Sequence, residues 1–241
     1  MSGGYIDLHS HYLPGVDDGV DTTEQGQALC CGLASIGFAK VVATPHIRSA
    51  MFDNEPAELR AAFERFCDDS RDVEGLPELG LGCEHFCDDV VFGLFARGEA
   101  LPYPGGHAAL VEFPDSIPQG VADQFFRIHV GGIRPVLAHP ERYRPLFKRS
   151  EPIERIADMG VALQLDVMSL VGKYGRAPRR AAERMLEEQL YFVASSDCHD
   201  PRDLDKVDKA IGRLAELVGD DGRDLLMRDN PAALLDGSAD P

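Results

Sequence analysis

Histidines and carboxylates of the kinds that bind metal ions recur along the 241-residue sequence, at the ends of short apolar runs. Nine residues share this position: His9, His11, Asp18, His46, Glu84, Glu112, His139, Asp197 and His199. Imidazole nitrogens combined with carboxylate oxygens suit Mn²⁺, Zn²⁺ or Fe²⁺ better than a soft thiolate site would. The residue types alone therefore predict a site for two or three divalent ions.

The spacing of these residues supports the prediction. His9 and His11 are separated by one residue, as are Asp197 and His199. Side chains two positions apart in an extended segment point the same way, so each pair can serve one ion. A single histidine at a strand end is usually structural, but coincidence is a poor explanation for five histidines and four acids at such ends.

The elements that would position these residues alternate between short β-branched runs and stretches of helical period, which predicts a parallel α/β sheet with crossover helices. We expect strands at residues 5–9, 39–44, 79–84, 108–113, 134–139, 161–167 and 190–195, and helices at 22–35, 55–72, 121–129, 153–159, 178–189 and 204–218. Segment 88–103 has no clear period and stays unassigned. In a parallel barrel the C-terminal strand ends meet on one face, where barrel enzymes place their catalytic groups.

One domain spanning residues 1–241 is the simplest organisation, because no repeat or linker divides the chain; frayed ends are expected at about residues 237–241. The apolar fraction of 44% is enough for a sizeable core. The net charge of −17, without a basic stripe, excludes a nucleic-acid partner.

Location can also be read from the sequence. The first twenty residues lack the pattern of a signal peptide, and every apolar stretch is interrupted well before the roughly 20 residues that a membrane span needs. The six cysteines lack the paired spacing of metal fingers, so we expect reduced thiols. A cytoplasmic protein without a membrane span is the resulting expectation.

The motifs resemble those of the PHP (polymerase and histidinol phosphatase) superfamily of metal-dependent phosphoesterases, and within it most closely the bacterial capsule-biosynthesis protein-tyrosine phosphatases. The resemblance is found at residues 6–11 (IDLHSH), 13–19 (LPGVDDG), 43–46 (ATPH), 139–143 (HPERY) and 195–199 (SSDCH), and it covers nearly the whole chain. The LPGVDDG and HPERY segments are specific to that branch, whereas His-x-His alone is a weak signal. The resemblance implies a distorted (β/α)7 barrel of the PHP type.

The resemblance also implies a trinuclear site with a particular distribution of ligands. His9, His11, Glu84 and Asp197 would hold one ion; Glu84, Glu112 and His139 a second; Asp18, His46 and His199 a third. Manganese is the expected metal, with Fe²⁺ and Zn²⁺ as alternatives. Residues 164–166 (QLD) depart from the family's usual Gln-x-Asn, which affects the hydrogen bonding around the ligands rather than the ligands themselves.

A metal-dependent phosphomonoesterase is the function that follows, with a metal-bound hydroxide attacking phosphorus in line. Negative charge that develops on the phosphoryl oxygens favours an arginine nearby. Arg142, three residues after His139, is the first candidate; Arg202, three after His199, is the second, and Arg48 is a weaker third.

The expected substrate is phosphotyrosine in a protein or peptide, such as the tail of a kinase that controls polysaccharide export. A phenolate leaving group needs little protonation, which agrees with the lack of an evident general acid. A small-molecule phosphatase of the histidinol-phosphate type and a non-catalytic metal-binding regulatory module are the alternatives. A cysteine-dependent phosphatase is excluded, because no cysteine has an arginine six residues after it.

Overall fold

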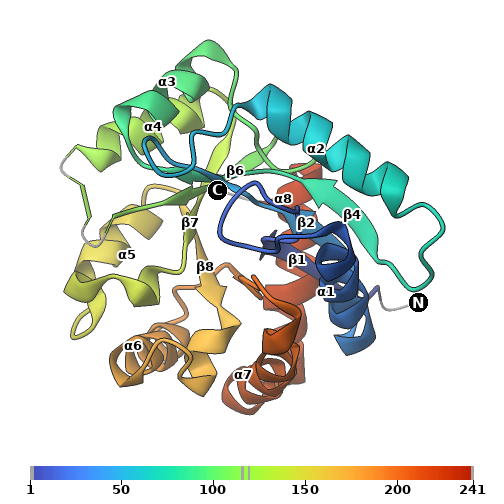
Figure 1. The fold of residues 1–241 in the computed structure, drawn as a ribbon. Coiled ribbons are helices and arrows are strands. Elements are labelled where there is room, and N and C mark those ends of the chain that lie inside the picture. Colours follow the sequence, from blue (N-terminus) through green and yellow to red (C-terminus); the bar gives the residue numbers. More distant parts are fainter. Residues whose placement is uncertain (1–2, 115–116, 119, 240–241) are drawn as a thin grey trace.

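Two all-parallel sheets make up the centre of the computed structural model, which describes residues 3–114, 117–118 and 120–239 (Figure 1). The three-stranded sheet has the order β1 (Tyr5–Ser10), β2 (Phe38–Ala43), β4 (Glu78–Leu81). The six-stranded sheet has the order β3 (His46–Ile47), β5 (Glu84–Phe86), β6 (Ala108–Glu112), β7 (Arg134–Ala138), β8 (Ala162–Asp166), β9 (Val193–Ser195).

The two sheets meet along both sides. On one side, the Asp197 amide donates to the carbonyl of His9 at 2.9 Å, and Ser10 forms a parallel bridge with Cys198, so β1 lies beside the chain that follows β9. On the other side, β2 and β4 lead directly into β3 and β5. The strands thus surround one centre with most helices outside them, while the C-terminal helix packs on the inner apolar cluster through Leu234 (Figure 1). The expected parallel α/β barrel architecture is confirmed, although its strands form two sheets.

Eight α-helices among the described residues connect and cover the strands: α1 (Thr23–Ile36), α2 (Pro56–Asp69), α3 (Asp89–Arg97), α4 (Val121–Val130), α5 (Glu151–Ala157), α6 (Arg176–Glu187), α7 (Leu204–Asp224) and α8 (Asn230–Asp236). Their ends follow local sequence signals. Thr22 and Gln25 form a capping box at the start of α1, and Gly37, with φ of 115°, ends it in the left-handed conformation. None of the helices in this part of the chain is long and apolar enough to span a bilayer.

The structure differs from the sequence-based expectation in several places, one of which is the short strand β3, at His46–Ile47, where no strand was expected. The strand expected at 79–84 is two strands in different sheets, since β4 ends at Leu81 and β5 begins at Glu84. Between them, the Gly82 amide donates to the carbonyl of Ala43. The unassigned segment 88–103 contains α3, capped by the Asp88 side chain. The tail contains α8, and the Ala239 amide bonds back to Ala233; residues 240 and 241 of the expected frayed end lie outside the described residues.

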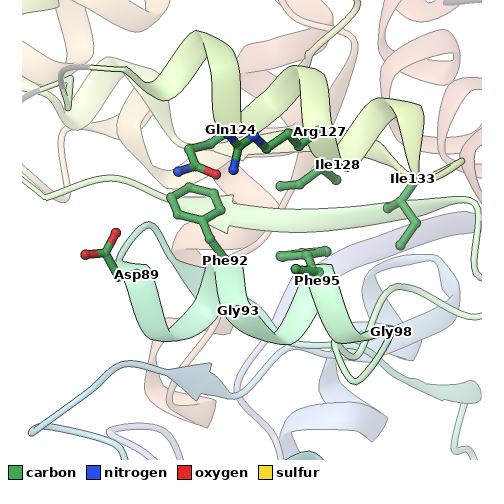
Figure 2. Close-up of a pocket in the computed structure, with 11 residues that line it drawn as sticks. Asp89, Phe92, Gly93, Phe95, Gly98, Gln124, Arg127, Ile128 and Ile133 are labelled. Carbon is green, nitrogen blue, oxygen red and sulfur yellow. The ribbon is translucent and has the colours of Figure 1, made fainter.

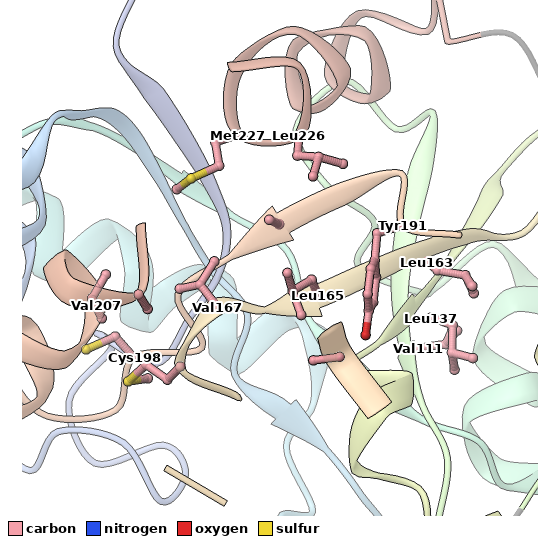
Figure 3. Packing of buried hydrophobic residues seen from close by; sticks show 14 of the residues in the cluster. Val111, Leu137, Leu163, Leu165, Val167, Tyr191, Cys198, Val207, Leu226 and Met227 are labelled. Atoms are coloured by element: carbon pink, nitrogen blue, oxygen red, sulfur yellow. The ribbon is translucent and has the colours of Figure 1, made fainter. Parts of the chain in front are cut away.

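Apolar side chains alternate along the strands between an outer layer beneath the helices and an inner layer at the centre. Val111, Leu137 and Leu163 belong to the outer layer (Figure 3), whereas Leu110 and Val136 belong to the inner one. Because the inner layer is filled by side chains, the barrel is a packed core rather than a pore. Toward the strand C-termini, polar side chains replace the inner apolar ones, and the candidate site begins there.

Candidate metal centre

All nine predicted ligands come together at the C-terminal ends of the strands. Their ligand atoms form four overlapping groups, each with its atoms within 4.8 Å of one another. The groups are His11–Asp18–His46–His199, His9–His11–Glu84, His9–His139–Asp197 and His46–Glu84–Glu112. Because His9, His11, His46 and Glu84 each belong to two groups, the four groups form one continuous cluster.

His9 lies at the buried centre of this cluster. Its Nε2 is 3.0 Å from Oε2 of Glu84, 3.1 Å from Oδ1 of Asp197 and 3.1 Å from Nε2 of His11. The pairing of β1 with β2 shifts register between Asp7 and Ser10. Such irregularities redirect side chains and occur often beside active sites.

Hydrogen bonds to Nδ1 orient three of the histidines. Nδ1 of His9 is 2.7 Å from Oε1 of Gln164, and Nδ1 of His11 is 2.7 Å from Oδ2 of Asp17. Nδ1 of His199 is 3.0 Å from the carbonyl of Asp197. When Nδ1 carries the proton and donates it to these acceptors, Nε2 keeps a free lone pair facing the cluster, as in many metal sites.

Glu84 is the carboxylate that connects the groups. Its Oε2 is 3.0 Å from Nε2 of His9 and 3.2 Å from Nδ1 of His46, while its Oε1 is 3.0 Å from Nε2 of His139. The side chain is 1% exposed. Each of its oxygens therefore faces different histidines, the arrangement that a bridging ligand requires.

The group formed by His11, Asp18, His46 and His199 lies nearer to solvent than the other three groups. Oδ1 of Asp18 is 3.4 Å from Nε2 of both His46 and His199, and the Asp18 side chain is 56% exposed. His11 stacks on His199 with ring centroids 3.9 Å apart. An ion held here would be the most accessible to water and substrate.

The surroundings shift the pKa values of two histidines of the cluster in opposite directions. Burial acts to lower the pKa of His9, but the carboxylates of Asp197 and Glu84 outweigh it and raise the pKa to about 9. Burial and the Arg142 guanidinium lower the pKa of His139 to about 4. Burial and the neighbouring Glu84 carboxylate raise the pKa of Glu112 to about 7. The cluster thus concentrates negative charge beside histidines.

The residues present fit divalent cations. Two buried carboxylate oxygens, Oε2 of Glu112 and Oδ1 of Asp197, have no hydrogen-bond partner in the structure. A buried anionic oxygen without a donor is costly, and carboxylate oxygens together with imidazole nitrogens form the donor set of hard to borderline metal ions.

The grouping differs in part from the one that the family resemblance implied. Asp18, His46 and His199 form one group as expected, and His11 joins them. Glu112, expected beside His139, is instead grouped with His46 and Glu84. The cause is strand pairing: His46 of β3 and Glu84 of β5 are register partners, and β6, which ends with Glu112, is the next strand.

Arg142 reaches the same cluster from the short 3₁₀ helix after β7. Its Nη1 donates to a carboxylate oxygen of Asp197 and lies 3.3 Å from Oδ2 of Asp166, and its Nη2 is 3.0 Å from Nε2 of His139. The guanidinium also lies 4.6 Å from the ring centroid of Tyr174. The side chain keeps 25% exposure, so part of it remains accessible from solvent.

The other two candidate arginines have different surroundings. The Arg202 side chain is 90% exposed and pairs with Asp200, to which its Nε donates at 2.9 Å. Arg48 lies over the ring of Phe86, 4.2 Å from its centroid. Arg142 is thus the arginine that the structure brings into contact with the predicted ligands.

Backbone geometry marks two of the ligands. His139 and Asp197 have φ angles of 36° and 48°, in the left-handed region that non-glycine residues seldom adopt. Such strain persists only where surrounding contacts fix it, and it is frequent at functional sites. His139 directly follows β7, and Asp197 lies two residues after the end of β9. The left-handed conformation at each position turns the side chain toward the cluster.

Several supporting residues could not be assigned a contact from the sequence. Gln164 and Asp166 lie two apart on β8 and therefore face the same side, the first toward His9 and the second toward Arg142. The only sign of this in the sequence was that the QLD triplet at 164–166 departs from the family's usual Gln-x-Asn. Glu141, fully buried beside Arg142, accepts bonds from Ser169 and Tyr191, which lie 28 and 50 residues away.

A separate pocket of about 360 Å³ lies on the outside of the barrel between α3 and α4 (Figure 2). Phe92 and Phe95 of α3 face Gln124 and Ile128 of α4 across it. None of the nine predicted ligands lines this pocket, so it is distinct from the metal cluster.

Comparison with known proteins identifies the family of the chain. A family model described as capsular polysaccharide synthesis, CpsB/CapC, matches residues 5–236. The tyrosine-protein phosphatase YwqE of Bacillus subtilis is 29% identical over 199 residues, which are 80% of this chain and 77% of that protein. The tyrosine-protein phosphatase CpsB of Streptococcus pneumoniae is 26% identical over 246 residues, covering 95% of this chain and 98% of that protein.

Solved structures extend the similarity to three dimensions. One from a study of YwqE from B. subtilis and CpsB from S. pneumoniae, described there as metal-dependent tyrosine phosphatases, superimposes with a TM-score of 0.88 at 26% identity, over 95% of this chain and 94% of that one. The lactonase Lmo2620 of Listeria monocytogenes matches with a TM-score of 0.59 at 13% identity, over 97% of this chain and 95% of that one, which shows a shared fold alone.

Proposed function

The chain belongs to the CpsB/CapC family of capsular polysaccharide synthesis proteins, and on that basis we propose that it is a metal-dependent protein-tyrosine phosphatase. Its substrate is phosphotyrosine in a protein segment, for which the tail of a tyrosine kinase that controls capsule or exopolysaccharide export is the expected source. The names of its relatives as tyrosine-protein phosphatases support this activity.

One structural observation supports the proposal most strongly. The four ligand groups overlap through shared residues, and Arg142 contacts two members of the cluster, His139 and Asp197. A multinuclear divalent site with a guanidinium beside it matches what phosphoryl transfer needs, namely charge compensation on several oxygens at once.

The nine residues would hold two or three divalent ions. Mn²⁺ is the proposed metal, with Fe²⁺ or Zn²⁺ as alternatives, and the donors, nitrogen and oxygen without sulfur, suit all three. When bound, such ions acidify water toward neutral pH and offset negative charge on phosphoryl oxygens. Asp18 and His199, the most exposed ligands, lie where a phosphate group would enter.

Residues around the ions take distinct parts in the reaction. Gln164 and Asp17 hold the imidazoles of His9 and His11 so that Nε2 of each faces the cluster that would bind the ions. Asp166 and Tyr174 orient Arg142, so that its guanidinium can offset negative charge on the phosphoryl oxygens. The phenolate of tyrosine leaves without a strong acid, and water supplies its proton.

We also propose that the protein acts in the cytoplasm. All six cysteines are free thiols in the structure, and four of them are buried: Cys30, Cys83, Cys87 and Cys198. Unpaired thiols in this number are typical of proteins that work in a reducing compartment.

Phosphate release from a phosphotyrosine peptide, measured with added Mn²⁺ and with a chelator, tests the proposed function. Chelator-sensitive release that is faster than release from histidinol phosphate is the expected result. His199→Ala should abolish most of it, whereas His129→Ala, which changes an exposed histidine on α4, should not. Faster turnover of histidinol phosphate would favour a small-molecule phosphatase, and no turnover at all a regulatory module.

A further inference from the structure

Two phenylalanines and an arginine that belong to none of the four ligand groups lie beside the metal cluster. We name Arg48, Phe52 and Phe86 the aromatic rim. The ring of Phe52 stacks on the imidazole of His46 with centroids 5.2 Å apart and planes 10° from parallel. The Arg48 guanidinium lies 4.2 Å from the centroid of the Phe86 ring. All three side chains are partly exposed.

Strand register explains why the aromatic rim lies above the ligands. His46 of β3 pairs with Glu84 of β5. Arg48 and Phe86 follow these two residues by two positions, so their side chains point to the same side, one step closer to the C-terminal mouth. Phe86 is itself the register partner of Glu112 on β6. The rim therefore borders three of the predicted ligands.

The loop that holds Phe52 is fixed by hydrogen bonds. The backbones of Arg48 and Phe52 bond to each other twice, at 3.0 and 2.8 Å. The Asn54 side chain donates to the carbonyls of His46 and Val16, at 2.8 and 2.9 Å. A ring held in place before binding costs little entropy when a ligand packs on it.

We infer that the aromatic rim receives the ring of an aryl phosphate and makes the site prefer aryl over alkyl phosphomonoesters. The rest of the cluster is charged and suits the phosphoryl group, whereas aromatic faces suit a ring in an offset-stacked or edge-to-face contact. Arg48 holds Phe86 through a cation–π contact and supports the rim instead of clamping phosphate. This inference rests on the proposed function and names the structural source of its substrate preference.

Binding of two phosphonates to the Mn²⁺-loaded protein tests the inference without relying on turnover. Phenylphosphonate and methylphosphonate carry the same anionic group, and their P–C bond resists hydrolysis. Isothermal titration should give about three- to tenfold tighter binding of phenylphosphonate by the unmodified protein, the effect of one or two aromatic contacts. Phe52→Leu and Phe86→Leu keep apolar volume while removing the ring, and each should reduce this preference.

Phe126→Leu serves as the matched control, because Phe126 is an exposed aromatic residue on α4 outside the rim, and its preference should equal that of the unmodified protein. Equal binding of the two phosphonates by the unmodified protein, or an unchanged preference in both rim variants, would overturn the inference. A phenylphosphonate preference without hydrolysis of phosphotyrosine would support the rim and contradict the proposed function. Hydrolysis of phosphotyrosine without a preference for phenylphosphonate would support the proposed function and contradict the role of the aromatic rim.

Discussion

Arg142 is hydrogen-bonded to Oδ2 of Asp197, while Oδ1 of the same carboxylate lies 3.1 Å from Nε2 of His9. One side chain thus faces the guanidinium with one oxygen and the histidine cluster with the other. Burial acts to raise the pKa of Asp197, but His9 and Arg142 outweigh it and hold the pKa well below its usual range. The carboxylate is therefore ionised at neutral pH and fixes the arginine relative to the proposed ions.

Replacing this arginine tests its role in catalysis. Arg142→Ala should lower kcat/KM for an aryl phosphate by about 100- to 1000-fold, the effect of removing one preorganised donor to developing charge. The Mn²⁺ content should stay the same, because all nine ligands remain. Arg144→Ala, which changes an exposed arginine two residues further on, is the control. An unchanged kcat/KM in Arg142→Ala would exclude the proposed role.

Gln164 is expected to control ion affinity through His9. Its Oε1 lies 2.7 Å from Nδ1 of His9 and orients the imidazole. Gln164→Leu keeps the size but loses this acceptor, and we expect Mn²⁺ binding to weaken about 10- to 100-fold, as is usual for partners of metal-bound histidines. Equilibrium titration of Mn²⁺ measures the change. Gln124→Leu, at the α3–α4 pocket, should bind as the unmodified protein does, and the same affinity in both variants would refute the prediction.

Ion binding should release protons at neutral pH. Although burial opposes it, the carboxylates of Asp197 and Glu84 raise the pKa of His9 to about 9, so the ion-free protein carries a proton there at pH 7. An ion must displace that proton, and the apparent affinity should therefore rise as the pH rises from 6 toward 9. Calorimetric titrations of Mn²⁺ in buffers with different ionisation enthalpies count the protons. A binding enthalpy independent of the buffer at pH 7 would contradict this prediction.

Glu141 gives a prediction on stability. Burial and the neighbouring Asp166 carboxylate raise the pKa of Glu141 to about 8. Since the folded state holds the proton more tightly than the unfolded state, this group makes the free energy of unfolding fall as the pH rises from about 4.5 to about 8. Glu141→Gln removes the titration and keeps the shape that contacts Ser169 and Tyr191.

Urea unfolding in the presence of a chelator, at pH 5.5 and pH 8, measures this effect. The free energy of unfolding should fall less between the two pH values in Glu141→Gln than in the unmodified protein, by about 1–3 kcal/mol. Glu151→Gln, at an exposed position on α5, should follow the unmodified protein. Identical pH dependence in all three proteins would mean that Glu141 is ionised in the fold.

The sequence could identify the nine candidate ligands, which the structure brings into one cluster, because several of them lie at or just after the end of an apolar run that is readable as a strand. His139, after the apolar run of β7, and Glu112, at the end of β6, are examples. β3 was missed because two residues, His46 and Ile47, are too few to form a periodic pattern. The alternation of strands and helices, and the end of the barrel at which the candidate ligands gather, could thus be predicted from the sequence.

What the sequence could not supply are contacts between distant segments. Glu112 is closer to His46 than expected because of strand pairing between β3, β5 and β6, which only the fold determines. Arg142 is held by an ion pair with Asp166 and a cation–π contact with Tyr174, which lie 24 and 32 residues further along the chain. Such contacts arise from tertiary packing and leave no periodic trace in the chain.

If this cluster holds divalent ions that make the protein a phosphatase, metal content and turnover must be lost together when a shared ligand is changed. Elemental analysis of the purified protein, unmodified and with Glu84→Gln, should be paired with Mn²⁺-supplemented hydrolysis of a phosphotyrosine peptide. We predict two or three ions per chain with chelator-sensitive phosphate release, and the loss of both in Glu84→Gln, since Glu84 faces histidines with each oxygen. Full metal content without release of phosphate from any tyrosyl phosphate would contradict the account.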